Sequence, residues 1–518
     1  MLLGYVSEEN YIAIADASVE LVRAGSSYAA RSRASGAVHA DIPAGRYQVT
    51  LSCPGYGPKS VTVDLQDGEP VQFRLLSDRV LGYVWPKWSA AGDLAEVRVH
   101  SPASYRVELW RYGWEKQFVR SLGYDSHAPF ATRRATPDGD YTRDGVRWED
   151  PLRSEAPDRS GLYYLHVHTA AGEFTSFPWV VTPSVPAAQV AVLTSSATWN
   201  AYNNFGGRSN YIDPVGLPPA PLVNRREELE RYMQPDLETW RAPQYAPLSF
   251  DRPEPANVIP LDEGITDPIT GRDACGLASA EWRLLGWLER NSIDYDLYAD
   301  VQVHFDEVDL DAYRVLILNT HPEYWSRTMF DKVLGWVERG GRLMYLGGNG
   351  VNCEIELPDP KTMVVLNGEA AVLDADRGRL QSRFGMTYRP EAGLLGVGFR
   401  RDGMMTAAPY RVVDGAHWVF EGTGLSEGDL FGQNCLHTRC PGGASGHEMD
   451  KLTTTSPAGT RLLAKGVNPG DSGAEMAYYE TPGGGAVFSV GSINYCCSLP
   501  VDDAISDVTR NVLRRFLG

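Results

Sequence analysis

The sequence predicts a multidomain protein in which two N-terminal β-sandwich modules precede a doubly wound α/β domain. Two observations indicate this arrangement. Short runs with period-two alternation fill the first third of the chain, whereas strand-like and helix-like runs alternate after residue 187. A third observation is the length of 518 residues, which favours about three domains at roughly 150 residues each.

Composition limits the classes of partner and the location. Acidic residues outnumber basic ones by 66 to 48, and the net charge of -18 argues against nucleic acid and anionic lipid as partners. No apolar run reaches the roughly 18 residues of a membrane span, so no membrane insertion is expected. The N-terminus lacks the pattern of a signal peptide. Seven cysteines without a CxxC pair argue against a disulfide framework and a structural zinc site. We therefore expect a cytoplasmic protein.

Residues 1–78 predict the first sandwich. Alternating strand-like runs at 18–22, 45–51 and 60–65 are separated by turns rich in proline and glycine, such as 53–57. The turn-strand-turn pattern resembles the carboxypeptidase-regulatory-like sandwich. The resemblance implies a structural module, or one that mediates contacts between subunits, and not a catalytic one.

Residues 79–186 predict a second, immunoglobulin-like sandwich. The runs 95–100 and 104–110 alternate well, and residues 161–168 and 173–179 form a hairpin pattern around a short polar turn. Prolines at the end of this region mark a linker to the rest of the chain.

Two histidines of the predicted hairpin, His166 and His168, lie on one face of their strand. Such a pair can bind a metal ion, but the surrounding sequence shows no third ligand. An ordinary strand pair is the favoured interpretation, because most histidines in proteins are not metal ligands.

Residues 187–518 predict the α/β catalytic domain. Strand-like runs at 189–194, 295–298, 313–319 and 342–346 alternate with helix-like runs at 279–291 and 327–339. Ser279 is the candidate N-cap of the first helix. This alternation predicts a parallel sheet, and ligands of such sheets bind at the carboxyl ends of the strands.

Three loops that follow predicted strands carry residues suited to chemistry. They span 198–209, 320–325 and 347–350. Since parallel strands end at the same edge of a sheet, we expect the loops to form one crevice. A phenol, a histidine, a carboxylate and an amide would meet there, from Tyr202, His321, Glu323 and Asn349.

Each of these residues also has an ordinary structural interpretation. Glu323 can cap the helix that begins near Ser326, Tyr202 can lie at a rim, and Asn349 can be the left-handed residue of a tight turn. Their joint position after three strands favours a functional site.

The predicted domain also resembles the class I glutamine amidotransferases in shape. In that fold a nucleophile elbow follows a strand such as 342–346. Here Asn349 lies near the elbow and Cys353 follows four residues later. The elbow needs its nucleophile on the turn itself, and no His-x-Glu pair stands near the C-terminus. Cysteine catalysis by Cys353 is therefore an alternative and not the main hypothesis.

A set of motifs in 188–518 is similar to the large (beta) subunit family of N,N-dimethylformamidase. The matching segments, in order, are Thr198–Asn203, Gly206–Ser209, Ser249–Pro253, His321–Trp325, Gly347–Asn349, Ala444–Asp450 and Val487–Asn494.

The resemblance implies an iron-dependent hydrolase of small amides of the formamide or N-alkylamide type. In that family one Fe(III) ion is held by two tyrosines and one glutamate. Carried over to this chain, the metal ligands are Tyr202, Tyr245 and Glu323, with Tyr211 as the alternative second tyrosine. The resemblance also implies that His321 and Asn349 orient water or substrate, and that Glu448 is an acid/base group. A homo-oligomer, with a small subunit as a further partner, is the implied assembly.

Two departures from the family pattern bear on the substrate. Glu254-Pro255 and Tyr495-Cys496-Cys497 stand where the family carries an aromatic residue and a tryptophan-containing stretch. We also expect this chain not to carry the family's extra N-terminal lectin-like domain. These differences make dimethylformamide itself a poorer expectation than another small amide. A catalytically inactive binding or scaffold protein of the same fold is the alternative from a different class.

Overall fold

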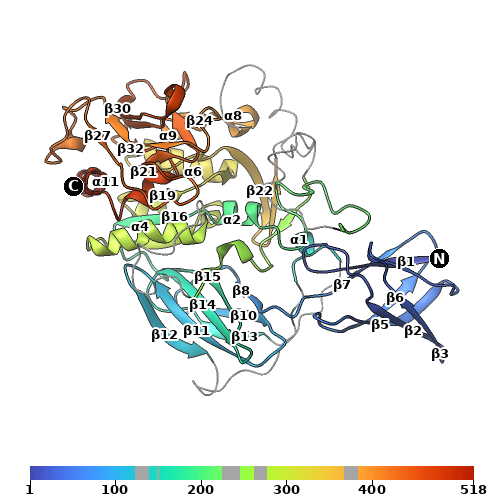
Figure 1. The fold of residues 1–518 in the computed structure, drawn as a ribbon. Helices are drawn as coiled ribbons and strands as arrows, with labels where there is room; N and C mark the ends of the chain where they lie inside the picture. Colours follow the sequence, from blue (N-terminus) through green and yellow to red (C-terminus); the bar gives the residue numbers. More distant parts are fainter. Residues whose placement is uncertain (123–138, 147, 149–150, 224–244, 262–276, 367–382) are drawn as a thin grey trace.

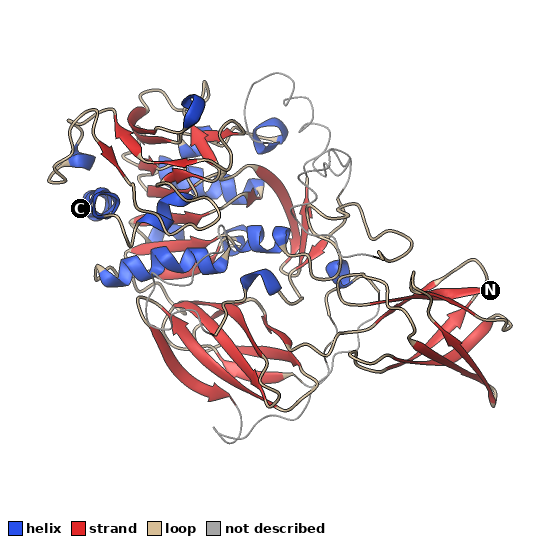
Figure 2. Ribbon diagram, viewed as in Figure 1, coloured by secondary structure: helices blue, strands red, loops and turns tan. Residues whose placement is uncertain are grey.

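The structure is a computed structural model that describes the chain except residues 123–138, 147, 149–150, 224–244, 262–276 and 367–382. Three regions follow one another along the sequence (Figures 1 and 2). In the part of the chain that is described, the first two regions consist of strands and one short helical turn, and the third combines strands with nearly all of the helices. The predicted boundaries at residues 78 and 186 stay predictions.

The N-terminal region contains two small sheets around one core. Alternating residues of its strands are buried, as in Tyr47, Val49 and Leu51 of β5, because successive side chains of a strand point to opposite faces. The first sheet has the order β4-β1-β7 and the second β3-β2-β5-β6. The strands are β1 (Leu2–Ser7), β2 (Ser18–Arg23), β3 (Ser26–Arg31), β4 (Ala37–His39), β5 (Gly45–Ser52), β6 (Lys59–Leu65) and β7 (Val71–Arg74).

The second region also pairs two sheets around a core of its own. Their orders are β13-β10-β8 and β12-β11-β14-β15-β9. The predicted hairpin is confirmed, because β14 and β15 pair antiparallel across the turn at residues 170–173. The strands are β8 (Leu81–Trp85), β9 (Trp88–Ala90), β10 (Leu94–His100), β11 (Tyr105–Tyr112), β12 (Lys116–Leu122), β13 (Leu152–Glu155), β14 (Gly161–Thr169) and β15 (Phe174–Thr182).

A nine-stranded sheet forms the centre of the third region, in the order β18-β16-β19-β21-β32-β31-β30-β26-β27. The first five strands are parallel and the others antiparallel. The predicted parallel sheet is thus correct for one half and wrong for the other. The strands are β16 (Val190–Thr194), β18 (Asp296–Ala299), β19 (Val315–Thr320), β21 (Arg342–Gly347), β26 (Tyr410–Val412), β27 (Leu430–Phe431), β30 (Arg461–Gly466), β31 (Glu475–Glu480) and β32 (Ala486–Ser489). The likeness to glutamine amidotransferases stays a prediction.

Three longer helices pack against the parallel half. They are α4 (Ala278–Arg290), α6 (Arg327–Glu338) and α11 (Asp503–Leu517). The first helix begins at Ala278 after Leu277, so Ser279 lies in its first turn and the predicted N-cap was wrong by two positions. Among the described residues, no helix combines the length and the apolar character needed to cross a membrane.

The remaining elements are short and lie around this sheet. Short helices are α1 (Tyr141–Asp144), α2 (Ser196–Tyr202), α5 (Val301–His304), α8 (Arg383–Thr387), α9 (Ala392–Leu395) and α10 (Asn494–Ser498). Further strands are β17 (Leu248–Ser249), β20 (Tyr324–Trp325), β22 (Cys353–Asp359), β23 (Thr362–Val365), β24 (Gly398–Arg400), β25 (Ala407–Ala408), β28 (Ser445–Gly446) and β29 (Met449–Lys451).

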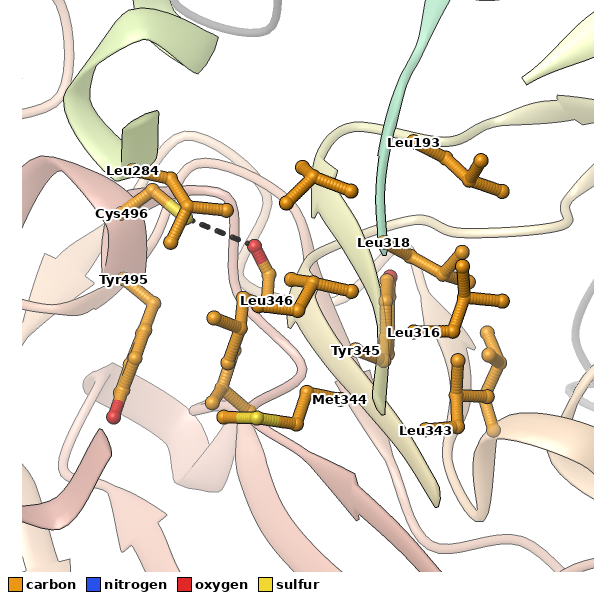
Figure 3. Packing of buried hydrophobic residues seen from close by; sticks show 14 of the residues in the cluster. Leu193, Leu284, Leu316, Leu318, Leu343, Met344, Tyr345, Leu346, Tyr495 and Cys496 are labelled. Atoms are coloured by element: carbon orange, nitrogen blue, oxygen red, sulfur yellow. Dashed lines mark hydrogen bonds between the residues drawn. The ribbon is translucent and has the colours of Figure 1, made fainter. Parts of the chain in front are cut away.

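The core of the third region lies where the parallel strands meet their helices (Figure 3). Every residue of β19 is buried, which explains its continuous apolar sequence. Leu284 of α4 and Cys496 of α10 lie on the same side of β21, and the Cys496 thiol donates to the Leu346 carbonyl at 3.0 Å (Figure 3). Replacing Leu284 by alanine would cost about 2–5 kcal/mol, as for other buried leucines.

The N-terminal region contacts the segment 205–222 of the third region. The Tyr11 hydroxyl donates to the Pro218 carbonyl at 2.8 Å, and the buried Arg74 guanidinium donates to the Gly206 carbonyl at 2.9 Å. These bonds hold the segment that carries Tyr211 against the first sandwich.

Candidate active site

The three loops predicted to form one crevice leave the neighbouring strands β16, β19 and β21. Hydrogen bonds connect the first two loops: the Thr198 hydroxyl donates to the His321 carbonyl at 2.8 Å and accepts from the Glu323 amide at 3.1 Å. The amides of Val351 and Asn352 donate to the carbonyls of Pro322 and Glu323. The Thr198 side chain therefore holds the first loop to the second, and backbone hydrogen bonds hold the second to the third.

Two phenols and a carboxylate lie at the centre of this crevice. The Tyr202 hydroxyl donates to Oε2 of Glu323 at 3.0 Å. The Tyr211 hydroxyl lies 2.8 Å from the Tyr202 hydroxyl and 3.4 and 3.5 Å from the two carboxylate oxygens of Glu323. Three acidic side chains thus share one small volume, and Glu323 is buried with 2% of its surface exposed.

A chain of hydrogen bonds continues behind Tyr211. The Asn210 side-chain amide donates to the Tyr324 hydroxyl at 2.7 Å, and Tyr324 donates to Tyr211 at 2.8 Å. Sequence reasoning did not select Asn210 or Tyr324. The only available signal was that both stand directly beside residues that it did select, Tyr211 and Glu323.

Tyr245, the predicted second metal ligand, precedes the strand β17. Its ring is 4% exposed and belongs to the same hydrophobic core cluster as Leu248 and Tyr324. The hydroxyl contacts with Tyr202 and Glu323 that are described above are made by Tyr211. The choice between the two tyrosines therefore stays a prediction, and each is testable.

A second polar group lies beside the phenols and consists of His321, Glu448 and Asn349. The Asn349 side-chain amide donates to Oε2 of Glu448 at 2.7 Å. Nε2 of His321 lies 3.2 Å from Oε2 of Glu448 and 3.3 Å from Oε2 of Glu323, although neither contact has the alignment of a hydrogen bond. The three predicted residues are brought together from the loop after β19, the loop after β21 and the turn before β29.

The charges of this group depend on one another. Burial opposes a charge on the His321 imidazole, but the nearby carboxylates of Glu448 and Glu323 raise the pKa of His321 above its ordinary value. Burial likewise opposes the charge on Glu448, but attraction from the nearby His321 ring and a hydrogen bond from the Asn349 side chain lower the pKa of that carboxyl. Both shifts favour a His321–Glu448 ion pair.

The backbone around the crevice is strained. Thr320, Asn349, Val351 and His447 adopt φ values of 54°, 51°, 52° and 68°, in the left-handed region that residues with a Cβ rarely occupy. Such strain persists where the surrounding structure fixes the chain, and it gathers at functional sites. Asn349 thus has the turn conformation of its structural interpretation and, in addition, a side-chain partner in Glu448.

Asp450 and a glycine keep the third loop in place. The Asp450 carboxylate accepts from the Asn349 amide at 2.9 Å and from the Tyr345 hydroxyl at 2.7 Å. A Cβ at Gly348 would stand 2.3 Å from the Glu448 carbonyl oxygen, so only glycine allows this approach. The loop after β21 and the loop that carries Glu448 are thereby fixed against each other.

The loop that follows Tyr202 depends on Arg252. This guanidinium is fully buried and donates to the carbonyls of Asn200, Asn203, Phe205 and Ser249. Burial lowers its pKa to about 9, with a further contribution from Arg208. One planar cation therefore satisfies four carbonyls, in the last turn of α2, in the loop that follows it and in β17, and it sets the end of α2, where Tyr202 lies.

Glu323 does not cap the helix α6. The helix α6 is capped by Ser326, whose hydroxyl accepts from the Met329 amide at 3.2 Å. The Glu323 side chain turns toward Tyr202 and Tyr211 instead. The structural interpretation of Glu323 as a cap was therefore wrong.

Cys353 lies beside the carboxylate and not on a nucleophile elbow. Its thiol is buried at the start of β22, and Sγ lies 3.6 Å from Oε1 of Glu323. The sharp turn after β21 carries Asn349, so the thiol lacks the position that the amidotransferase hypothesis needs.

The donor set suits a hard, highly charged cation. Phenolates and carboxylates are anionic oxygen ligands, which such ions prefer over the nitrogen and sulfur sites typical of Zn²⁺ and Cu(I). Two buried polar atoms beside them, Nε2 of His321 and Oδ1 of Asn349, have no hydrogen-bond partner in the described structure. A bound ion with its water shell, or a substrate, would satisfy these atoms.

The two departures noted in the sequence have structural roles. Glu254 is buried and forms an ion pair with Lys87 of the second region at 3.3 Å. Tyr495, Cys496 and Cys497 form part of α10, and all three are buried. Arg283 of α4 donates to the Cys497 sulfur at 2.8 Å.

Comparison with known protein families gives two matches. A family model described as "N,N-dimethylformamidase beta subunit-like, C-terminal" matches residues 106–508. A second, the carboxypeptidase regulatory-like domain, matches residues 1–76 and supports the prediction for the first sandwich.

Among characterised proteins, the chain is similar to the N,N-dimethylformamidase beta subunits of Paracoccus aminophilus and of Alcaligenes sp. Each is 27% identical over 438 residues, with 72% of this chain and 55% of the relative covered. The chain thus spans about half the length of these relatives. Among solved structures, a DUF3823 family protein from Bacteroides ovatus covers 34% of this chain and 98% of its own, at 10% identity and a TM-score of 0.14. A likeness this weak carries no argument.

Proposed function

Because the chain belongs to the N,N-dimethylformamidase beta subunit-like family, we propose that it hydrolyses the C–N bond of a small amide at the Tyr202–Glu323 crevice. The observation that carries the proposal is the meeting of Tyr202 and Glu323, at 3.0 Å, beside the His321, Asn349 and Glu448 group. The family match covers 106–508 and includes all five residues.

The proposed metal is a single Fe(III) ion. Tyr202 and Glu323 would hold it, with Tyr245 as the second phenolate. Three anions would balance the ion's charge and leave coordination positions open. When bound, ferric iron supplies Lewis acidity toward a carbonyl oxygen and toward water. Tyr211, whose hydroxyl lies between Tyr324 and Tyr202, is assigned to donating a hydrogen bond to a ligand oxygen, as such partners orient metal ligands.

The residues beside the ligands would move the protons. In amide hydrolysis a water oxygen bonds to the carbonyl carbon, the C–N bond breaks, and the amine nitrogen takes up a proton. Glu448 is proposed to accept the proton from water, and His321, 3.2 Å away, to pass a proton to the departing amine. Asn349 holds the Glu448 carboxylate through its hydrogen bond. Acid and amine are the products, and no redox change occurs.

The decisive experiment combines metal analysis with amine release. Purified protein is expected to contain about one iron per chain and a phenolate-to-iron absorption band. It is then given a panel of formamide, N-methylformamide, dimethylformamide and acetamide. Tyr202→Phe and Glu323→Ala should lose the iron and all turnover, because each removes an anionic ligand. The matched controls are Tyr388→Phe, which removes a phenol bonded to Asp331, and Glu356→Ala, which removes an exposed carboxylate of β22.

Two outcomes would overturn this proposal. Protein without iron, with Glu323→Ala as active as the wild type, would exclude the metal mechanism. Iron-containing protein that cleaves no amide in the panel would favour the scaffold alternative. Cys353→Ser tests the remaining alternative: turnover should persist, since the hydroxyl keeps a donor toward Glu323, whereas complete loss with the iron retained would favour cysteine chemistry.

A further inference from the structure

A second cluster of ligand-type side chains lies on the sheet of the second region, away from the proposed active site. It consists of Glu108 on β11 and of His166 and His168 on β14. In the antiparallel pairing Glu108 stands opposite His166, and His168 follows two positions later on the same face. One ligand atom of each side chain lies within 4.8 Å of the other two. The third ligand that the local sequence did not show is thus supplied by the neighbouring strand.

The surroundings of the cluster orient its side chains. The Tyr112 hydroxyl lies 2.7 Å from Nε2 of His166, and the Trp110 indole donates to Oε2 of Glu108 at 3.1 Å. The Trp110 ring also stacks on His166, with 5.3 Å between centroids. Partners of this kind fix the ring and carboxylate orientations of metal ligands.

The charge state of this cluster leaves lone pairs on its imidazole nitrogens and carboxylate oxygens available to a cation. Burial, with a contribution from Lys116, lowers the pKa of His166 to about 3, and burial also lowers the pKa of His168. Both imidazoles are therefore neutral near pH 7, so the 3.7 Å contact between His168 and Glu108 is not an ion pair. The cationic partner of Glu108 is Arg106, which is more than half exposed and lies 3.4 Å from the other carboxylate oxygen.

We propose that Glu108, His166 and His168 bind a divalent transition-metal ion of the Zn²⁺ type. Two imidazoles and one carboxylate are a common ligand set for such ions, and three protein ligands leave a position for water. His166 would bind through Nδ1, which preserves the hydrogen bond between Nε2 and Tyr112. Glu108 and His168 are partly exposed, with 17% and 20% of their side-chain surfaces accessible, so an ion can reach the site from solvent.

The site would stabilise the contact between this sheet and the third region. The Tyr112 ring that contacts His166 also lies 4.5 Å from the Trp282 ring of α4, centroid to centroid. Figure 1 shows α4 running along the end of this sheet. A metal that fixes His166 would therefore also restrain Tyr112, which contacts Trp282 at the interface.

The experiment separates this site from the proposed iron site. A Tyr202→Phe/Glu323→Ala background, stripped with a chelator, is titrated with Zn²⁺ and with Co²⁺. We expect about one equivalent of Zn²⁺ per chain, a Co²⁺ absorption spectrum of low coordination number, and a rise in the thermal unfolding midpoint. His168→Gln and Glu108→Gln, added separately, should each weaken binding at least tenfold and abolish the rise in the midpoint. The matched control is His39→Gln, which removes an exposed histidine of β4.

Each result decides the proposal. Two partly exposed positions were chosen for substitution so that the variants fold, which their far-ultraviolet spectra and metal-free midpoints check. Unchanged Zn²⁺ affinity in both variants would overturn the proposal, and so would an equal loss in His39→Gln. A background protein that binds no Zn²⁺ above non-specific levels would also overturn it.

Discussion

The Tyr202 hydroxyl lies 3.0 Å from Oε2 of Glu323, although 121 positions separate the two residues. Both groups are acids, and Glu323 is buried with Tyr202 partly buried beside it. Two anions at this distance repel each other strongly at low dielectric. The contact is therefore favourable only while a proton is shared or a cation lies between the oxygens, and this dependence can be measured.

The first prediction concerns protons released on metal binding. Binding of Fe(III) should release about two protons per ion at pH 7, because two phenols give up their protons to become ligands. Calorimetry in buffers of different ionisation enthalpy measures this number. In Tyr202→Phe, which should not hold the iron, this proton release should be lost together with binding. Release that is equal in both proteins would argue against Tyr202 as a ligand.

A second prediction separates the two candidate tyrosines. Tyr245→Phe should lose the iron or its absorption band, because it removes an anionic ligand. Tyr211→Phe should keep about one iron per chain but shift the band, since it removes hydrogen bonds to the Tyr202 and Glu323 oxygens and no proposed ligand. Metal content and the visible spectrum report both effects. The reverse pattern would assign the ligand role to Tyr211.

The third prediction concerns the proton-transfer group. Glu448→Gln keeps the size of the side chain and can still contact Asn349, so iron content should not change. Turnover should fall by about 10²–10⁴-fold, the usual contribution of a general acid or base. Rate measurements at saturating amide with parallel iron analysis test this. Turnover within threefold of the wild type would remove Glu448 from the mechanism.

A fourth prediction concerns acid stability and rests on His437. This buried ring accepts a hydrogen bond from the Cys440 amide at 2.8 Å, and burial, with His447 nearby, lowers its pKa to about 3. Between about pH 6.5 and 3 the unfolded chain binds a proton here and the folded chain does not. Stability should therefore fall as the pH falls through this window, by at most about 1.4 kcal/mol per pH unit.

The variant His437→Gln tests this assignment because its side chain does not titrate. At pH 7 it should melt below the wild type, owing to the altered hydrogen bond. At pH 5 the gap between the two melting midpoints should narrow, since only the wild type loses stability with acid. A gap that stays constant from pH 7 to pH 5 would show that His437 does not titrate differently in the two states.

Periodicity predicted the part of the site that parallel strands control. Tyr202, His321, Glu323 and Asn349 follow consecutive neighbours of one sheet, so their meeting follows from strand recognition alone. In the antiparallel half, β26 and β27 escaped notice because they have only three and two residues, too few to show a period.

Periodicity could not predict the contacts of side chains that lie in irregular segments or on a neighbouring strand. Tyr211 and Tyr245 both stand outside the helices and strands of the described residues, where spacing sets no direction for a side chain. Glu108 could be joined to His166 only through the register of β11 against β14. The register of two paired strands cannot be derived from the local sequence of either one, because the register is set by the pairing of whole strands and by their turns.

The hydrogen bonds from the first sandwich to residues 205–222 have a consequence for experiments on shortened forms of this protein. Tyr11 and Arg74 donate to the carbonyls of Pro218 and Gly206, on either side of Tyr211. A shortened chain that begins after residue 76 would leave those carbonyls without their donors and the Tyr211 segment without its support. Kinetic constants from such a fragment would describe a loosened crevice. Exchanging the module between relatives would likewise alter catalysis unless the incoming module supplied both donors.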